Sequence, residues 1–321
     1  MDNKKKKVLV IVGATASGKT GLGIRLAKEM SGEIISADSM SIYKGLDIGT
    51  AKVTKEEMQS IPHHLIDILN PGENFSVAEY KKLCYEKIEE VLSRGNLPII
   101  VGGTGLYINS VVNNMNFDNV DNVEKKDSED EVEYSKYLEE VLRTDGNDAL
   151  YNLLVEKDFE ASKNVHKNNT KRVMRALEIV NKYGAKSEVE KRDDLWNRNT
   201  SPYEFFVIYL NPPREILYER INDRVDKMAE EGIIEEARKL YDMDIDERST
   251  CMSAIGYKEW FGYIGGVTSK EDCKHNLKQA TRRYAKRQIT WFNKLGYEYL
   301  IEDLENIDND VKEIQRRVYG S

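Results

Sequence analysis

The start of the chain holds the feature that most constrains the fold, a short apolar run followed by a glycine-bounded loop. Residues 8–12 are apolar and mostly β-branched, which is typical of a fully buried strand. Residues 20–27 can continue as a helix after the loop. A strand, a loop of the form G-x-x-x-x-G-K-[ST] and a helix in that order predict a phosphate-binding loop. The loop residues are Gly13, Ala14, Thr15, Ala16, Ser17, Gly18, Lys19 and Thr20.

The residue types in this loop suit a phosphate anion. Its glycines allow backbone N–H groups to converge on a phosphate without interference from Cβ atoms. Lys19 supplies a mobile positive charge, Thr20 offers a hydroxyl for Mg²⁺, and the helix N-terminus adds a partial positive charge. The alternative is a glycine-rich turn that matches by chance, and the flanking strand and helix argue against it.

Composition and charge exclude several classes of protein. The 321 residues, 40% of them hydrophobic, allow one large α/β domain and a smaller one. A net charge of −8 excludes a generally basic nucleic-acid binder, so any nucleic-acid surface must be local. The cysteines, Cys84, Cys251 and Cys273, form no CxxC pair, which argues against a zinc finger or a disulfide framework. No apolar run has the length of a membrane span, so we expect a soluble, cytoplasmic protein that binds no membrane.

Short apolar strands alternate with helices over the first 116 residues. Strands are predicted at 33–37, 62–68 and 97–101. A helix is predicted over 76–92, where Ser76 and Glu79 have the spacing of a capping box. This alternation, with glycine-rich loops at strand ends, predicts an α/β fold with a parallel, doubly wound sheet.

Two polar side chains are expected at the ligand-binding edge of this sheet. Asp38 follows the strand 33–37, and Thr104 follows two glycines at the end of the strand 97–101. Ligands of open α/β sheets bind beyond the carboxyl ends of the strands. Asp38 is equally well explained as a turn former or helix cap. The pair His63-His64 would bind a metal only with further ligands, and two polar residues before a strand are the simpler interpretation.

Residues 117–199 differ from the chain around them. The stretch 118–148 is rich in Asp and Glu, and its first part is expected to be loop or frayed helix. Helices are predicted at 149–154 and 170–180. Because no strand pattern occurs here, we expect a helical insertion at 117–199 in an α/β core formed by residues 1–116 and 200–321.

Two basic helices are predicted in the second half of the core. The first follows the strand 205–210 and carries Arg220 and Arg224 on one face, where they could bind a diphosphate or form a solvated basic face. The second, 274–294, contains no Asp or Glu and is the best candidate for a polyanion-facing helix, with an ordinary surface helix as the alternative. Its basic residues include Lys278, Arg282, Arg283, Lys286 and Arg287.

Seven stretches in a fixed order resemble one known family. They are GATASGKT (13–20), DSMSIYKGLDIGTAK (38–52), GGTGLY (102–107), KRVMRALE (171–178), YERINDRVDKM (218–228), AIGYKEW (254–260) and TRRYAKRQITWF (281–292). The residues of these stretches and their order along the chain resemble those of the bacterial tRNA dimethylallyltransferases, also called tRNA isopentenyltransferases. The phosphate loop alone is shared by many families, whereas the stretches at 38–52 and 281–292 are far more specific.

The resemblance implies a fold and a reaction. The fold is the parallel-sheet core of P-loop nucleoside-triphosphate hydrolases with a helical insertion that contacts tRNA. The reaction moves a dimethylallyl group from dimethylallyl diphosphate to N6 of the adenosine immediately 3′ of the anticodon, in tRNAs that read codons beginning with U. Diphosphate is released, Mg²⁺ is the cofactor, the anticodon stem-loop of tRNA is the partner, and we expect a monomer.

The resemblance also implies roles for individual residues. Asp38 would accept a proton from the adenine amine. Lys19, the loop amides, Mg²⁺ near Thr20 and Arg224 would stabilise the leaving diphosphate, and Thr104 would donate to its bridging oxygen. The predicted diphosphate site comprises residues 13–20 with Arg220 as a second arginine beside Arg224. The predicted tRNA-contacting residues are Asp38, Ser39, Met40, Ser41, Lys171, Arg172, Val173, Met174, Arg175, Ser253, Gly256, Tyr257, Lys258, Arg282, Arg283, Lys286 and Arg287.

Two other enzyme classes fit parts of the same sequence. A small-molecule or nucleoside kinase would bind ATP at Lys19 and use Asp38 to activate a hydroxyl. A prenyltransferase acting on free AMP or ATP would share all the chemistry. Both are disfavoured by the basic helices, which a small substrate does not need.

Overall fold

The computed structural model describes residues 5–115, 129–184, 201–243, 245–246, 249–252 and 254–320. The chain divides into two compact units. Residues 1–116 and 195–321 form the first, and residues 117–194 form the second.

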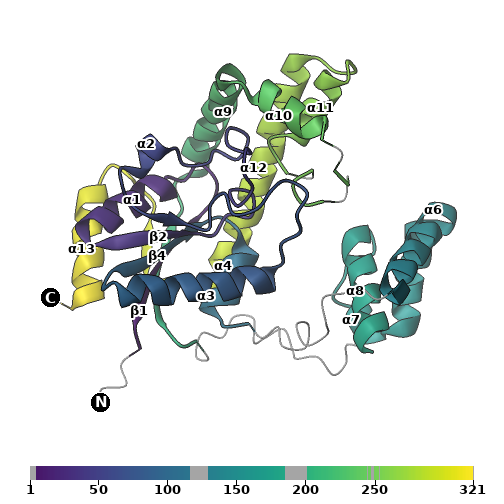
Figure 1. The fold of residues 1–321 in the computed structure, drawn as a ribbon, viewed down its shortest axis with the longest axis horizontal. Helices are drawn as coiled ribbons and strands as arrows, with labels where there is room; N and C mark the ends of the chain where they lie inside the picture. The colour runs from purple at the N-terminus through teal and green to yellow at the C-terminus, as the bar shows by residue number, and fades with distance from the viewer. Residues whose placement is uncertain are drawn as a thin grey trace. The chain divides into compact units, whose positions relative to one another are not determined.

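The first unit is built on one six-stranded sheet with the order β3-β2-β4-β1-β5-β6, of which Figure 1 labels β2, β4 and β1. All neighbouring strands are parallel, and Val10 in the centre of β1 lies beside Ile100 on β4 and Val207 on β5. The predicted parallel α/β fold is therefore confirmed. The strands are β1 (Lys7–Gly13), β2 (Gly32–Ser36), β3 (His63–His64), β4 (Leu97–Gly102), β5 (Glu204–Leu210) and β6 (Tyr299–Ile301).

Two of these strands differ from the sequence prediction. The strand predicted over 62–68 is much shorter, because Leu65 and Asp67 have φ angles of 60° and 54° that end the extended conformation after His64. The short edge strand β6 was not predicted, and it pairs only with the last three residues of β5.

Helices cover both faces of the sheet. Alternate residues of β1 point to opposite faces, with Val8, Val10 and Val12 on one and Leu9 and Ile11 on the other. The valine face packs against α3 (Val77–Ser93) and α4 (Gly105–Val112). The opposite face packs against α1 (Lys19–Glu29) and α13 (Ile307–Tyr319). The predicted capping box of Ser76 and Glu79 starts α3.

A second core lies beyond the carboxyl end of β2. Four helices pack against the loop that follows this strand, and they lie in the upper part of Figure 1, from which α12 runs down toward the sheet. Tyr43 from the loop and Tyr257 and Trp260 from the helical part are almost fully buried there. The helices are α9 (Arg214–Glu231), α10 (Ile233–Tyr241), α11 (Lys258–Ile264) and α12 (Lys270–Leu295), and the short α2 (Lys55–Met58) follows the loop.

The regular elements described in the second unit are helices. They are α6 (Glu129–Lys157), which is interrupted at Gly146, α7 (Phe159–Ser162) and α8 (Thr170–Tyr183). The unit has its own small core, to which Leu138, Leu150 and Leu177 contribute. No helix in the described ranges of either unit is long and apolar enough to cross a membrane.

A buried carboxylate fastens the start of β2. Glu33 accepts hydrogen bonds from Arg94 Nε (2.9 Å) and Nη2 (2.7 Å), from Asn96 Nδ2 (2.7 Å) and from His64 Nε2 (2.6 Å). The bonds from Arg94 above all, with those from Asn96 and His64, lower the pKa of Glu33 to about 2. Among the residues that the structure describes, no group of three or more His, Cys, Asp or Glu side chains could hold a metal ion. His64 contributes to this hydrogen-bond network through its contact with Glu33.

We expect Glu33→Gln to lower the melting temperature by several degrees near pH 7, because Arg94, Asn96 and His64 lose hydrogen bonds to a buried, charged acceptor. The folded-state pKa lies below the unfolded one, so this stabilisation is present above about pH 4.5 and is lost as the pH falls toward 2. Melting curves of both proteins near pH 7 and pH 3 should therefore differ more at the higher pH. Glu90→Gln, which removes an exposed ion pair with Lys87, is the control, and equal effects of the two substitutions would contradict the prediction.

Candidate active site

A cavity of about 550 Å³ opens at the carboxyl ends of β1, β2 and β4. Segments far apart in the sequence contribute to its wall. They include the glycine-bounded loop at 13–20, the segment after β2, the end of β4, helix α9, the residues leading into α11 and helix α12. The polar side chains in the lining include Thr15, Lys19, Thr20, Asp38, Arg224 and Arg287.

The glycine-bounded loop places Lys19 in this wall. Gly18 ends the loop with a φ of 96°, a conformation that favours glycine, and α1 begins at the next residue. The Lys19 ammonium donates a hydrogen bond to the carbonyl oxygen of Ala14 (2.7 Å). Burial above all, with the positive charge of Arg224, lowers its pKa to about 7, whereas Asp38 acts in the opposite direction. An anion in the cavity would therefore favour the protonated form of Lys19.

Arg224 approaches the same loop from α9. Its Nη1 donates to the Thr15 hydroxyl (3.3 Å), and burial lowers the pKa of the guanidinium. Among the described residues that line the cavity, Arg224 is present and Arg220 is not. The site thus combines two half-buried cations with the start of a helix, which suits a phosphate or diphosphate anion.

Asp38 lies directly after β2 and lines the cavity. Its Oδ1 accepts hydrogen bonds from the backbone N–H groups of Met40 (2.9 Å) and Ser41 (3.3 Å), so the carboxylate closes a turn. Because both of these bonds use Oδ1, Oδ2 is the oxygen left to accept a proton. The structure therefore supports both interpretations of Asp38, as a turn former and as a side chain of the site.

Thr104 ties two segments of the site together. Its Oγ1 accepts a hydrogen bond from the Ser39 N–H (3.0 Å) and lies 3.3 Å from the Ser39 hydroxyl. It is absent from the described lining of the cavity, whereas Gly102 and Gly103 are part of it. A contact of Thr104 with a bound diphosphate stays a prediction.

Gln288 is a residue that the sequence analysis missed. Its side chain is buried, accepts from the Thr15 N–H (2.8 Å) and donates to the Gly103 carbonyl (2.9 Å). It thereby joins the loops that follow the neighbouring strands β1 and β4. A Cβ atom at position 103 would collide with this amide. The feature of the sequence that could have indicated this role is an uncharged polar residue on the apolar side of a basic helix.

The predicted tRNA-contacting residues fall into several groups. Asp38, Ser39, Met40, Ser41, Lys258 and Arg287 line the cavity. Lys171, Arg172, Arg175, Arg283 and Lys286 are exposed, Met174 is half-buried, and Ser253 lies outside the described residues. Arg282 donates to Asn222 on α9 (2.6 Å), which gives it a partner within the protein.

The structure corrects two predictions in this set. Val173 is fully buried in the core of the second unit, so its side chain has no surface to offer RNA. Tyr257 is also fully buried, with its hydroxyl on Glu236 and its ring where a Cβ of Gly49 would lie. Gly256, with a φ of 113°, packs against the Gly49 backbone. The sequence of these two motifs does not indicate which of their residues are buried and which are exposed, because helical spacing and position within a motif are the same for both.

Comparison with known proteins gives consistent matches. Residues 41–295 match a family model described as IPP transferase. A tRNA dimethylallyltransferase of Acetivibrio thermocellus is 45% identical over 319 residues, which cover 99% of this chain and 97% of the relative.

Two solved structures are also similar. The tRNA isopentenylpyrophosphate transferase of Bacillus halodurans has a TM-score of 0.69 and 42% identity, and the match covers 99% of this chain and 96% of that one. A eukaryotic dimethylallyltransferase acting on tRNA has a TM-score of 0.77 and 30% identity, and the match covers 97% of this chain and 78% of that one. The similarity predicted from separate stretches therefore extends over nearly the whole chain.

Proposed function

The chain belongs to the tRNA dimethylallyltransferase (IPP transferase) family and transfers a dimethylallyl group to tRNA; we propose how its own residues carry out this transfer. The donor is dimethylallyl diphosphate, and the acceptor is N6 of the adenosine immediately 3′ of the anticodon in tRNAs that read codons beginning with U. The observation that supports this reaction best is a single cavity lined by a phosphate-type loop, two half-buried cations and a carboxylate.

Diphosphate binds and departs at Lys19, Arg224 and the backbone N–H groups of the loop. These groups face negative charge that grows on the diphosphate as its bond to carbon breaks. Their burial strengthens the interaction, because charges attract more strongly where water is excluded. The electron pair of the breaking C–O bond leaves with the diphosphate.

Mg²⁺ fits this site as a companion of the diphosphate. The described residues offer no cluster of three protein ligands of the His, Cys, Asp or Glu type, whereas the Thr20 hydroxyl lines the cavity at the start of α1. Mg²⁺ is commonly held by one or two protein oxygens together with substrate phosphates and water. When bound, it would neutralise charge on the diphosphate oxygens.

Asp38 takes the proton that the adenine amine loses. As N6 forms its bond to the allylic carbon, a proton passes from nitrogen to the carboxylate. An exocyclic amine conjugated to a purine is a weak nucleophile, so a base at hydrogen-bond distance assists the attack. The adenosine must leave the stack of the anticodon loop to reach Asp38. The apolar lining by Val225, Met228 and Leu277 excludes water from the cation-like dimethylallyl group.

Two exposed basic surfaces support binding of the tRNA backbone. One consists of Lys171, Arg172 and Arg175 on α8, and the other includes Arg283 and Lys286 on α12. Contacts of lysine and arginine with phosphates position an RNA without reading its sequence. Residues 117–199 are accordingly proposed as the insertion that contacts the anticodon stem.

We expect the double substitution Arg283→Ala/Lys286→Ala to weaken tRNA binding in a salt-dependent way. The slope of log K against log salt should fall by about 1 for each phosphate group that the variant no longer neutralises. Arg287 is kept because it lines the cavity, and Arg282 because it binds Asn222. Arg316→Ala/Arg317→Ala on α13 removes the same charge elsewhere and is the control. An unchanged affinity and slope would make this face of α12 an ordinary surface.

A transfer assay tests the proposed reaction. The protein is incubated with Mg²⁺ and labelled dimethylallyl diphosphate, together with unmodified tRNA, AMP or ATP in parallel tubes. We expect label in the tRNA alone, at the adenosine next to the anticodon. Label in AMP or ATP would identify an adenylate prenyltransferase, and transfer of the ATP γ-phosphate to a small acceptor would identify a kinase.

A further inference from the structure

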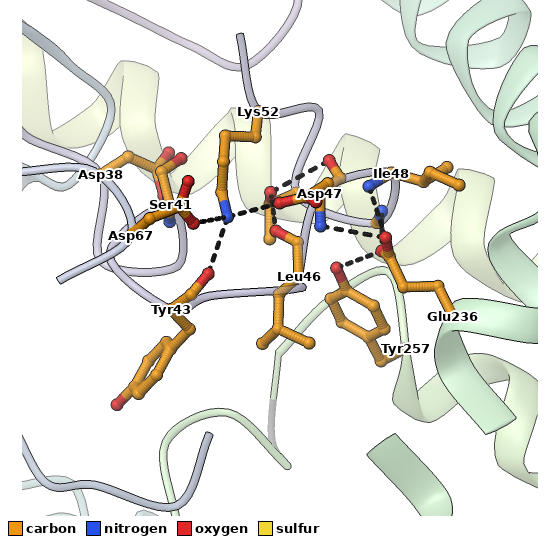
Figure 2. A network of polar contacts seen from close by, with 12 residues as sticks. Asp38, Ser41, Tyr43, Leu46, Asp47, Ile48, Lys52, Asp67, Glu236 and Tyr257 are labelled. Atoms are coloured by element: carbon orange, nitrogen blue, oxygen red, sulfur yellow. Dashed lines mark hydrogen bonds and ion pairs between the residues drawn. The ribbon is translucent and has the colours of Figure 1, made fainter. Parts of the chain in front are cut away.

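The carboxylate of Glu236 fastens the loop after β2 to the helical part of the first unit. Glu236 lies in the first half of α10 (Figure 2). Its Oε2 accepts from the backbone N–H groups of Asp47 (3.1 Å) and Ile48 (3.1 Å). Its Oε1 accepts from the Gly49 N–H (3.0 Å) and from the Tyr257 hydroxyl (2.6 Å). Three successive N–H groups directed at one anion form a concave anion-binding turn, and here a side chain of the protein occupies it.

The same carboxylate holds a second segment against this turn. Tyr257 is fully buried, and burial above all raises the pKa of its phenol, so the hydroxyl stays protonated and donates to Glu236. A Cβ atom at Gly49 would meet the Tyr257 ring at 2.5 Å, and one at Gly256 would collide with the Gly49 carbonyl. The turn 47–49 and the segment 254–258 therefore touch through backbone and ring, with Glu236 bonded to both.

Lys52 secures the other side of the loop. Its ammonium is almost fully buried and donates to the Tyr43 carbonyl (2.7 Å) and to the carboxylates of Asp47 (2.6 Å) and Asp67 (2.6 Å) (Figure 2). Asp47 is thus held through its side chain by Lys52 and through its backbone by Glu236. The loop has little freedom to move between these two anchors.

The loop held in this way forms one wall of the cavity. Its start, residues 38–41, and its end, residues 49–51, both line the cavity, as does Lys258 at the start of α11. Glu236 itself is absent from the described lining. Its influence on the cavity must therefore pass through the backbone that it holds.

We propose that Glu236 is a positioning residue for the tRNA side of the active site, holding the 47–49 turn and the 254–258 segment at the spacing that admits the acceptor adenosine. The inference rests on the proposed function, because it assumes that this wall meets tRNA. Glu236 bonds to the 47–49 turn and to Tyr257 and is absent from the described cavity lining that holds Lys19 and Arg224, so diphosphate binding should not depend on it.

The test compares Glu236→Ala and Glu236→Gln with Glu235→Gln, an exposed neighbour on the same helix. We expect Glu236→Ala to lower kcat/KM for tRNA by about tenfold to a hundredfold, because small displacements of a substrate-positioning wall cost this much. KM for dimethylallyl diphosphate should stay within about twofold of the wild-type value. Glu236→Gln, which keeps one acceptor oxygen, should fall between Glu236→Ala and the wild type.

Further measurements separate positioning from stability. Binding of tRNA without the allylic donor should weaken in Glu236→Ala, and binding of inorganic diphosphate should not. A lower melting temperature with reduced kcat and both KM values unchanged would overturn the inference, since less folded enzyme would explain it. Equal kinetics of Glu236→Ala and Glu235→Gln would overturn it as well.

Labelling of tRNA by the wild-type protein tests the proposed function in the same experiment. If the wild-type protein and Glu235→Gln label tRNA while Glu236→Ala matches them, only the inference about Glu236 fails. If neither labels tRNA, the proposed reaction fails. In that case unchanged tRNA binding by Glu236→Ala would overturn the positioning role, and weaker binding would support it.

Discussion

Replacing Asp38 with asparagine is expected to lower kcat for transfer to tRNA by about 10²–10⁴-fold, the usual contribution of a positioned general base. Asparagine keeps an oxygen where Oδ1 accepts from Met40 and Ser41, so the turn after β2 is preserved. It removes the carboxylate that accepts the N6 proton. Binding of tRNA and of inorganic diphosphate should therefore change little while the chemical step is lost.

A second variant separates the turn from the proton transfer. Asp38→Ala removes the proton acceptor and also both hydrogen bonds of the turn, so its binding of tRNA should be weaker than that of Asp38→Asn. Single-turnover rates report the chemical step, and equilibrium binding reports the turn. Near wild-type kcat in Asp38→Asn would mean that another group or water accepts the proton.

The parts of the site that sequence alone predicted are those encoded locally. The strand at 8–12, the glycine loop and Lys19 follow one another in the chain, so pattern and chemistry coincide. Asp38 was placed at the sheet edge because it follows a strand, and the structure puts it in the cavity lining. Such predictions need only the rule that parallel strands present their carboxyl ends on one side.

The residues that were missed act across long distances in the sequence. Gln288 bonds to the loop at Thr15, 273 residues away, and Glu236 bonds to Gly49, 187 residues away. A lone glutamine or glutamate on a helix carries no pattern that would reveal such a partner. The same limit explains Val173 and Tyr257, whose motifs predicted RNA contact while tertiary packing buried them.

Short, irregular elements were the other source of error. The strand predicted over 62–68 has the apolar composition of a buried strand, yet Leu65 and Asp67 adopt positive φ angles. The Asp67 carboxylate accepts a hydrogen bond from Lys52, and the Asp67 N–H donates to the Ser41 carbonyl (3.2 Å). These contacts with the loop after β2 accompany the departure of residues 65–67 from the extended conformation. Local propensity carries no information about such a network.

Replacing Lys19 with methionine is expected to lower kcat/KM for dimethylallyl diphosphate by about 10²–10³-fold, because one cation that faces the departing charge is removed. Methionine fills a similar volume but loses the hydrogen bond to the Ala14 carbonyl, so the melting temperature should fall by no more than a few degrees while the protein stays folded. Lys28→Met, which removes an exposed charge from the same helix, is the control and should leave the kinetics unchanged.

The pKa of Lys19 gives this prediction a dependence on pH. Without an anion the pKa is about 7, and a bound diphosphate raises it, so above pH 7 binding must take up a proton. Affinity for inorganic diphosphate should therefore decrease as the pH rises above about 7, more steeply in the wild-type protein than in Lys19→Met. Calorimetry in buffers of different ionisation enthalpy measures the uptake, and the difference between the two proteins removes the titration of diphosphate itself. Equal affinities, equal slopes and equal proton uptake in the two proteins would show that Lys19 does not meet the diphosphate.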